Sequence, residues 1–95
     1  MAHKLSDTEL SNALGKLADW QKLDTRDAIF KSFKFSNFSE AFSFMTRVAL
    51  KAEQLDHHPE WTNIYSSVQI TLSTHSANGV TALDIQLATF IEEIY

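Results

Sequence analysis

Several residue types are scarce in this 95-residue chain, and each scarcity removes a class of protein. The absence of cysteine excludes a disulfide framework and thiolate chemistry, and it fits a reducing compartment. Two glycines and one proline are too few for a glycine-rich phosphate loop or for long linkers. No basic cluster accompanies the net charge of −4, and no apolar run approaches the ~20 residues of a membrane span. We therefore expect a soluble cytoplasmic protein that contacts neither nucleic acid nor a membrane.

The residues that are present give an ordinary globular composition. Apolar residues make up 44% of the chain, and seven residues are phenylalanine. A chain of this length buries roughly 60–65% of its unfolded surface, which allows one hydrophobic core but not two. No composition shift, internal repeat or low-complexity tract divides the sequence. We therefore expect a single domain over residues 1–95.

Three helices are predicted from capping boxes, in which a polar N-cap residue is followed three positions later by an acidic one: Ser6 and Glu9, Asn37 and Glu40, Thr81 and Asp84. The first helix is short, with a break expected near residues 19–20. The second has the strongest amphipathic pattern and should run to about Leu55, before Pro59 forbids a continuation. We expect its phenylalanines, including Phe38 and Phe42, to lie in the core. The third runs to the C-terminus.

Strands are expected in the gaps between these helices. Residues 20–23 and 29–35 favour a hairpin around a polar turn, and residues 61–65 and 68–72 favour a second pair of strands. The resulting order is α-β-β-α-β-β-α. Paired strands between helices predict an α+β fold, with a four-stranded antiparallel sheet and three helices packed on one face. The other face would be solvated or covered by another subunit.

Two adjacent histidines lie where the second helix should end, in the run Glu53-Gln54-Leu55-Asp56-His57-His58-Pro59-Glu60-Trp61. His75 follows the last predicted strand, and Asp84 lies one loop further on. Imidazoles titrate near neutral pH, so three of them grouped with carboxylates can donate and accept protons. Neighbouring residues in extended backbone point in opposite directions, which favours separate roles for His57 and His58 over one shared metal ion.

Each of these residues also has a structural interpretation. Histidine complements the dipole at a helix C-terminus, and Asp84 is the expected capping partner of Thr81. Glu53 fits a solvated helix face, while Trp61 fits a core or an interface. The grouping of histidines favours a pocket for proton transfer on a neutral or polar organic ligand. The residues themselves do not identify that ligand, and a metal-binding protein remains a third, less favoured interpretation.

The motif Glu53-x-x-x-His57-His58-Pro59, followed by Trp61, Tyr65, Ser73-Thr74-His75 and Asp84, resembles pterin-4a-carbinolamine dehydratase. Residues 26–30, 44–50 and 70–75 are also similar to the animal enzymes, so the resemblance covers most of the chain. It implies a four-stranded antiparallel sheet with three helices on one face, assembled into a homodimer or homotetramer. The implied reaction removes water from 4a-hydroxytetrahydropterin to give quinonoid dihydropterin, in tetrahydrobiopterin recycling, with neither a metal nor an organic cofactor.

The resemblance also implies residue roles. The catalytic set is His57, His58 and His75, in which His57 and His75 act as acid–base groups and His58 chiefly holds the pterin. Glu53 and Asp84 would orient imidazoles or contact the ring. The implied substrate-binding set comprises Glu53, Asp56, His57, His58, Trp61, Ser73, Thr74, His75, Ser76 and Asp84.

Animal members of the family also serve as a dimerisation cofactor for a homeodomain transcription factor. The alternative function is therefore a non-enzymatic coactivator that binds a helical partner and also enters the nucleus. The loop His75-Ser76-Ala77-Asn78 departs from the animal pattern, which tends to carry Glu and Cys after the histidine. That departure bears on the transcriptional partner rather than on the acid–base residues.

Overall fold

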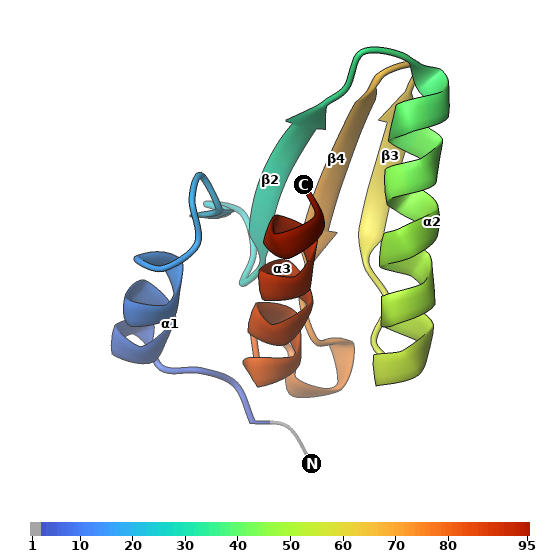
Figure 1. The fold of residues 1–95 in the computed structure, drawn as a ribbon. Helices are drawn as coiled ribbons and strands as arrows, with labels where there is room; N and C mark the ends of the chain where they lie inside the picture. Colours follow the sequence, from blue (N-terminus) through green and yellow to red (C-terminus); the bar gives the residue numbers. More distant parts are fainter. Residues whose placement is uncertain (1–2) are drawn as a thin grey trace.

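The computed structural model describes residues 3–95 and arranges them as a four-stranded antiparallel sheet with three helices on one face (Figure 1). The helices are α1 (Asp7–Leu14), α2 (Phe38–Leu55) and α3 (Ala82–Ile94). The strands are β1 (Gln21–Lys22), β2 (Ile29–Lys34), β3 (Glu60–Ile64) and β4 (Ser67–Leu72), and a short 3-10 turn, η1 (His75–Ala77), precedes α3. The predicted α+β fold and its element order are confirmed. Within residues 3–95, none of the helices has both the length and the apolar character needed to span a bilayer.

The core lies between the sheet and the helices, and strand alternation determines which residues enter it. In the sheet order β1-β2-β4-β3, the two central strands pair Ile29 with Leu72 and Phe33 with Val68. These four side chains and Ile70 are almost fully buried, while the alternate residues Phe30, Ser32, Gln69 and Thr71 face the opposite side. Each buried side chain of this size contributes about 1.5–3 kcal/mol relative to an exposed one. The central strands are therefore rigid supports for whatever their ends carry.

All three helices start directly after their predicted N-cap residues, and the full capping box forms in two of them. Complete capping boxes form at Ser6 of α1 and at Thr81 of α3. At α2 the Asn37 side chain accepts the amide of Glu40 at 2.9 Å, but the Glu40 carboxylate accepts the amide of Ser36 instead of closing the box. The end of α1 also differs from the prediction, because the helix stops at Leu14, with Gly15 as its C-cap, rather than near residues 19–20.

The outer face of α2 contradicts the expectation that its phenylalanines are core residues. Phe38 and Phe42 are 49% and 57% exposed, and their rings lie 5.8 Å apart on the surface. Leu50 is 69% exposed further along the same helix. The prediction was wrong because α2 carries apolar residues on two faces, and periodicity alone does not say which face meets the sheet. The buried face is formed by Ala41, Phe44, Val48 and Ala52.

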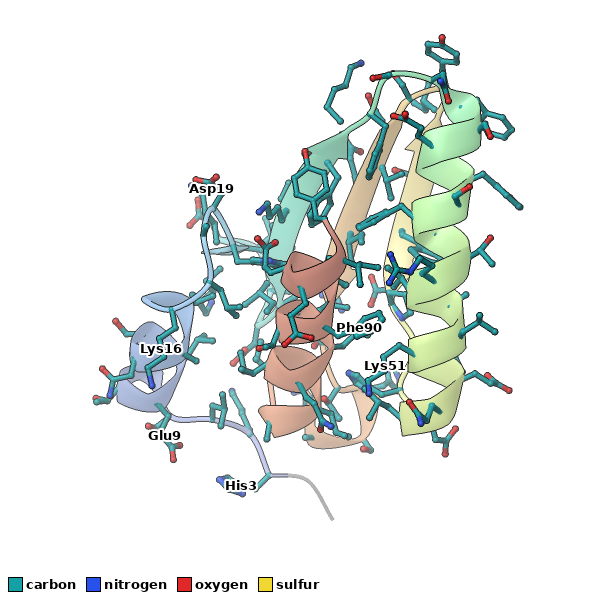
Figure 2. All side chains as sticks on the ribbon, viewed as in Figure 1. His3, Glu9, Lys16, Asp19, Lys51 and Phe90 are labelled. Carbon is teal, nitrogen blue, oxygen red and sulfur yellow. The ribbon has the colours of Figure 1, made fainter. Side chains whose placement is uncertain are left out.

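Two polar contacts fix α3 against its neighbours. On the buried side of β2, the ammonium of Lys31 lies 2.8 Å from the carboxylate of Glu92, which also accepts the indole N–H of Trp20 at 2.9 Å. On the other side, the ammonium of Lys51 in α2 lies 5.5 Å from the ring centroid of Phe90 (Figure 2). These contacts fix the C-terminal half of α3, and the N-terminus of α3 lies beside the C-terminus of α2 and the loop after β4 (Figure 1).

Candidate active site

The C-terminus of α2 directs His57 into the protein. Asp56 caps the helix in the left-handed conformation, with φ of 51°, and the chain then turns sharply away from the helix axis. The amide of His57 still donates to the carbonyl of Ala52 at 3.0 Å, which fixes the direction of the next side chain. As a result His57 is only 8% exposed, and its Nε2 lies 2.5 Å from Oδ1 of Asp84.

Asp84 is fully buried at the start of α3, where its carboxylate receives three hydrogen bonds. Besides His57, the hydroxyl of Thr74 donates to Oδ2 at 2.8 Å and the backbone amide of Thr81 donates to it at 2.9 Å. The Thr74 and Thr81 hydroxyls also lie 2.7 Å apart. Charge-assisted hydrogen bonds and the helix N-terminus both favour an anionic group here. Asp84 therefore caps α3 and orients an imidazole at the same time.

This contact selects the reactive nitrogen of His57. An ionised carboxylate only accepts hydrogen bonds, so Nε2 of His57 carries the proton that points at Asp84. In the neutral imidazole Nδ1 is then an acceptor, and in the imidazolium it is a donor. Nδ1 of His57 has no hydrogen-bond partner among residues 3–95. Because every buried side-chain nitrogen and oxygen in these residues does have one, Nδ1 is in contact with solvent. It is the nitrogen of His57 able to exchange a proton with a ligand.

His58 points away from His57 and has its own carboxylate partner. Its Nε2 lies 2.8 Å from Oε1 of Glu53, which is located in the last turn of α2. Both side chains are exposed, at 57% and 80%, so the pair contributes at most about 1 kcal/mol to stability. The opposite directions of the two imidazoles agree with the expectation of separate roles. An exposed, hydrogen-bonded imidazole of this kind is available to contact a ligand.

His75 lies in η1 and lines a small polar pocket of about 80 Å³. The other lining residues are Arg26, Asp27, Glu60, Ser73, Thr74 and Asn78. Thr74 belongs both to this pocket and to the hydrogen-bond network of Asp84, so one residue links the His75 side of the site to the His57 side. The structure thus joins His57 and Thr74 through the carboxylate of Asp84, and His75 directly follows Thr74 in the chain.

An ion pair lies in the wall of the same pocket. The guanidinium of Arg26 binds the carboxylate of Glu60 through two hydrogen bonds of 2.7 and 2.9 Å. These bonds hold the pKa of Glu60 below its ordinary value, against the opposing effect of partial burial, and His75 acts in the same direction. Glu60 is therefore charged near His75 at neutral pH.

Sequence reasoning missed Arg26, Asp27, Glu60 and Asn78 as pocket residues. For Arg26, Asp27 and Glu60, the pairing of the strands could have indicated this position. β2 begins at Ile29 opposite Leu72, and β3 begins at Glu60 opposite Thr71. Residues at or just before the start of these two strands must therefore flank the end of β4, where residues 73–75 begin.

Three predicted binding residues lie apart from these contacts. Asp56 is exposed at the end of α2, Ser76 is exposed in η1, and Trp61 is half-buried on β3, where it packs against the core. Their contact with a ligand stays a prediction. In the part of the chain that the structure describes, no three His, Asp or Glu side chains converge as a metal site requires.

Comparison with known proteins identifies the family. Residues 3–94 match the family model described as pterin 4 alpha carbinolamine dehydratase. The chain belongs to this family. A relative from Paraburkholderia xenovorans strain LB400, named provisionally as a pterin-4-alpha-carbinolamine dehydratase, is 57% identical over 99% of this chain and 98% of its own length. A relative from Bradyrhizobium sp. strain BTAi1 with the same provisional name is 55% identical, over 99% of this chain and 95% of its own length.

Solved structures agree with this assignment. The crystal structure of a transcriptional coactivator/pterin dehydratase from Brucella melitensis is 54% identical, covers 97% of this chain and 98% of its own, and has a TM-score of 0.95. A pterin dehydratase-like protein identified as a RuBisCO assembly factor in the alpha-carboxysome has a TM-score of 0.68, at 19% identity over 80% of this chain and 88% of its own. The second similarity concerns the fold alone. The resemblance noted from the histidine motif is confirmed at the level of the family.

Proposed function

We propose that this protein is a dehydratase that removes water from 4a-hydroxytetrahydropterin and releases quinonoid dihydropterin. The observation that carries the proposal is the His57–Asp84 pair, in which a buried carboxylate leaves Nδ1 of His57 free to exchange a proton. Hydroxide is a poor leaving group, so an acid must protonate the 4a-oxygen as the bond to C4a breaks. A base removes the proton from N5, whose electron pair then forms the N5–C4a double bond.

The proposed roles follow the three histidine environments. His57 and His75 act as the acid–base groups, since one is backed by Asp84 and the other lines the polar pocket next to Thr74. His58, held by Glu53 on the exposed side, contacts the pterin. Asp56, Trp61, Ser73 and Ser76 complete the proposed binding surface. Proton transfer and positioning are sufficient for this reaction, so we propose no metal and no organic cofactor.

A second candidate function is a coactivator that binds a helical partner. It is favoured by the exposed apolar residues Phe38, Phe42 and Leu50 on α2, and the Brucella melitensis relative is named for both activities. The same face would serve assembly into a homodimer or homotetramer. We place the dehydratase in the cytoplasm, and the coactivator function would add a nuclear role.

The test of the dehydratase follows the decay of freshly generated 4a-hydroxytetrahydropterin by ultraviolet absorbance. We expect the wild type to accelerate the decay and the folded His57→Ala/His75→Ala double variant to lose that acceleration. His3→Ala is the matched control, because it removes an exposed histidine outside the site and should retain full activity. A wild-type rate equal to the uncatalysed rate would refute the proposal. Elemental analysis that finds stoichiometric zinc would refute its metal-free form.

A further inference from the structure

The loop that carries His75 is closed by its own backbone. The amide of Thr74 donates to the carbonyl of Gly79 at 2.8 Å, and the amide of Gly79 donates back to the carbonyl of Thr74 at 3.3 Å. His75 is exposed within this loop, so few side-chain contacts hold it. Its position relative to the pocket therefore depends on how the base of the loop is attached to the rest of the protein.

Asp27 forms hydrogen bonds to both ends of the loop that carries His75. Its backbone carbonyl accepts the hydroxyl of Ser73 at 2.9 Å, on the side where the loop begins. Its Oδ1 accepts the amide of Val80 at 3.1 Å, on the side where the loop ends. Its Oδ2 lies 3.1 Å from the ammonium of Lys4, and the amide of Leu5 donates to the carbonyl of Val80 at 2.8 Å. The N-terminal segment and Asp27 therefore hold Val80 through both of its backbone groups.

The packing around Gly79 shows how closely these groups approach the loop. A Cβ atom added at Gly79 would lie 2.9 Å from Cδ of Lys4 and 3.0 Å from Cγ of Asp27. The two side chains thus lie directly on the loop backbone. Asp27 also lines the same pocket as His75, so the attachment point and the histidine share one cavity wall.

We propose that Asp27 is a positioning residue, which fixes the loop of residues 73–80 so that His75 faces the pocket. The kinetic consequence rests on the proposed dehydratase function, whereas the structural consequence for His75 does not. A partly exposed ion pair such as Lys4–Asp27 contributes little to global stability. Small displacements of an acid–base group, in contrast, strongly reduce the rate of a positioned proton transfer.

The pKa of Asp27 agrees with this arrangement. Partial burial acts to raise the pKa, but the Val80 amide and the Lys4 ammonium outweigh it and keep the pKa of Asp27 below its ordinary value. The carboxylate is therefore charged throughout the neutral range, and both of its oxygens remain acceptors.

Two substitutions separate the hydrogen bond from the charge. Asp27→Ala removes the acceptor of the Val80 amide and the partner of Lys4. Asp27→Asn retains an oxygen for the Val80 amide and loses the charge together with the acceptor of the Lys4 ammonium. We expect Asp27→Ala to lower kcat by roughly 10- to 100-fold with a smaller effect on KM, and Asp27→Asn to restore kcat to within about threefold of wild type. Asp24→Ala, an exposed aspartate in the preceding turn, is the control and should change neither constant.

Nuclear magnetic resonance provides the readout that does not depend on activity. In Asp27→Ala we expect the amides of Gly79 and Val80 to exchange faster and the His75 imidazole signals to move, while the His57 signals stay in place. If Asp27→Ala does not fold, Gly79→Ala displaces the same side chains from the loop and should move the same His75 signals. An inactive wild type would refute the dehydratase, and the His75 signals would still decide the role of Asp27. Unchanged His75 signals, or equal losses of kcat in Asp27→Ala and Asp27→Asn, would overturn the inference.

Discussion

Replacing Asp84 with asparagine tests whether this carboxylate sets the proton position on His57. The backbone amide of Thr81 can only donate, so the asparagine oxygen must face Thr81 and Thr74, and its NH₂ group must face His57. Nε2 of His57 would then have to accept a hydrogen bond, which moves the proton of the neutral imidazole to Nδ1. The nitrogen available to the ligand would lose its ability to act as a base.

The size of the effect follows from the contacts. Acid–base groups contribute typically 10²–10⁴ in rate, so we expect kcat of Asp84→Asn to fall by about 10²–10³. The variant weakens the hydrogen bonds to residue 84, because a hydrogen bond to a charged group contributes about 1.5–3 kcal/mol and a neutral one about 0.5–1.5 kcal/mol. It also relieves the cost of burying a charge, which opposes this loss of stability. We therefore expect a loss of only about 1–2 kcal/mol in stability. Asp84→Ala would instead leave His57, Thr74 and Thr81 without their shared acceptor and break the capping box of α3, at a cost of roughly 2–6 kcal/mol, so it is the less informative variant.

The assay compares the decay of 4a-hydroxytetrahydropterin with the ¹⁵N chemical shifts of the His57 ring. Asp24→Asn makes the same chemical change at an exposed position and should leave activity and stability as in the wild type. A folded Asp84→Asn protein with wild-type kcat would refute the reasoning. The same holds for an unchanged His57 tautomer, because the argument predicts a proton on Nδ1.

Three further predictions concern the exposed side of the site, the dependence of stability on acid pH and the surface of α2. Glu53→Gln should raise KM several-fold with a smaller change in kcat, because the exposed glutamate only holds His58; an equal fall in kcat and kcat/KM would contradict this. Asp27 and Glu60 have pKa values below those of the unfolded chain, near 4, so the stability they supply is complete above about pH 5 and is lost as the pH falls through their folded pKa values. Urea unfolding between pH 3 and 6 checks the sign of that slope. Phe42→Ser should cost less than about 1 kcal/mol, since the ring is 57% exposed, yet reduce self-association measured by light scattering.

The fold could be predicted because its signals are local. Capping residues define where each helix starts, and alternation in β4 separates a buried face from a polar one. The facing of α2 was not predictable in the same way. Ala41 and Phe42 are adjacent in the sequence, yet the first is fully buried and the second is exposed, because the contacts with β4 and α3 select the inward face. The choice of the inward face depends on contacts between distant parts of the chain, so a short stretch of sequence does not reveal it.

The candidate residues could be picked out from the sequence, but the pairing of their side chains could not. Asp84 had a sufficient explanation as a helix-capping residue, and nothing in the sequence joins it to His57, 27 positions earlier. The pairing of His58 with Glu53 was equally open, since both carboxylates were candidates for either imidazole. Only the turn at Asp56 decides it, because this turn sends His57 inward and leaves His58 on the surface.

Asp84 explains how so small a domain holds the buried His57–Asp84 pair without further residues dedicated to supporting it. The start of α3 requires acceptors for its free amides, and the Asp84 carboxylate meets that need through Thr81. The second oxygen of the same carboxylate is then held in one direction by a helix that packs on the core through Leu87 and Ile91. The imidazole of His57 is therefore oriented by a group that the fold already needs. The position of His57 and the stability of α3 are coupled at this residue, so the Asp84 variants above should affect both, whereas variants of Asp27 should act mainly on the position of His75.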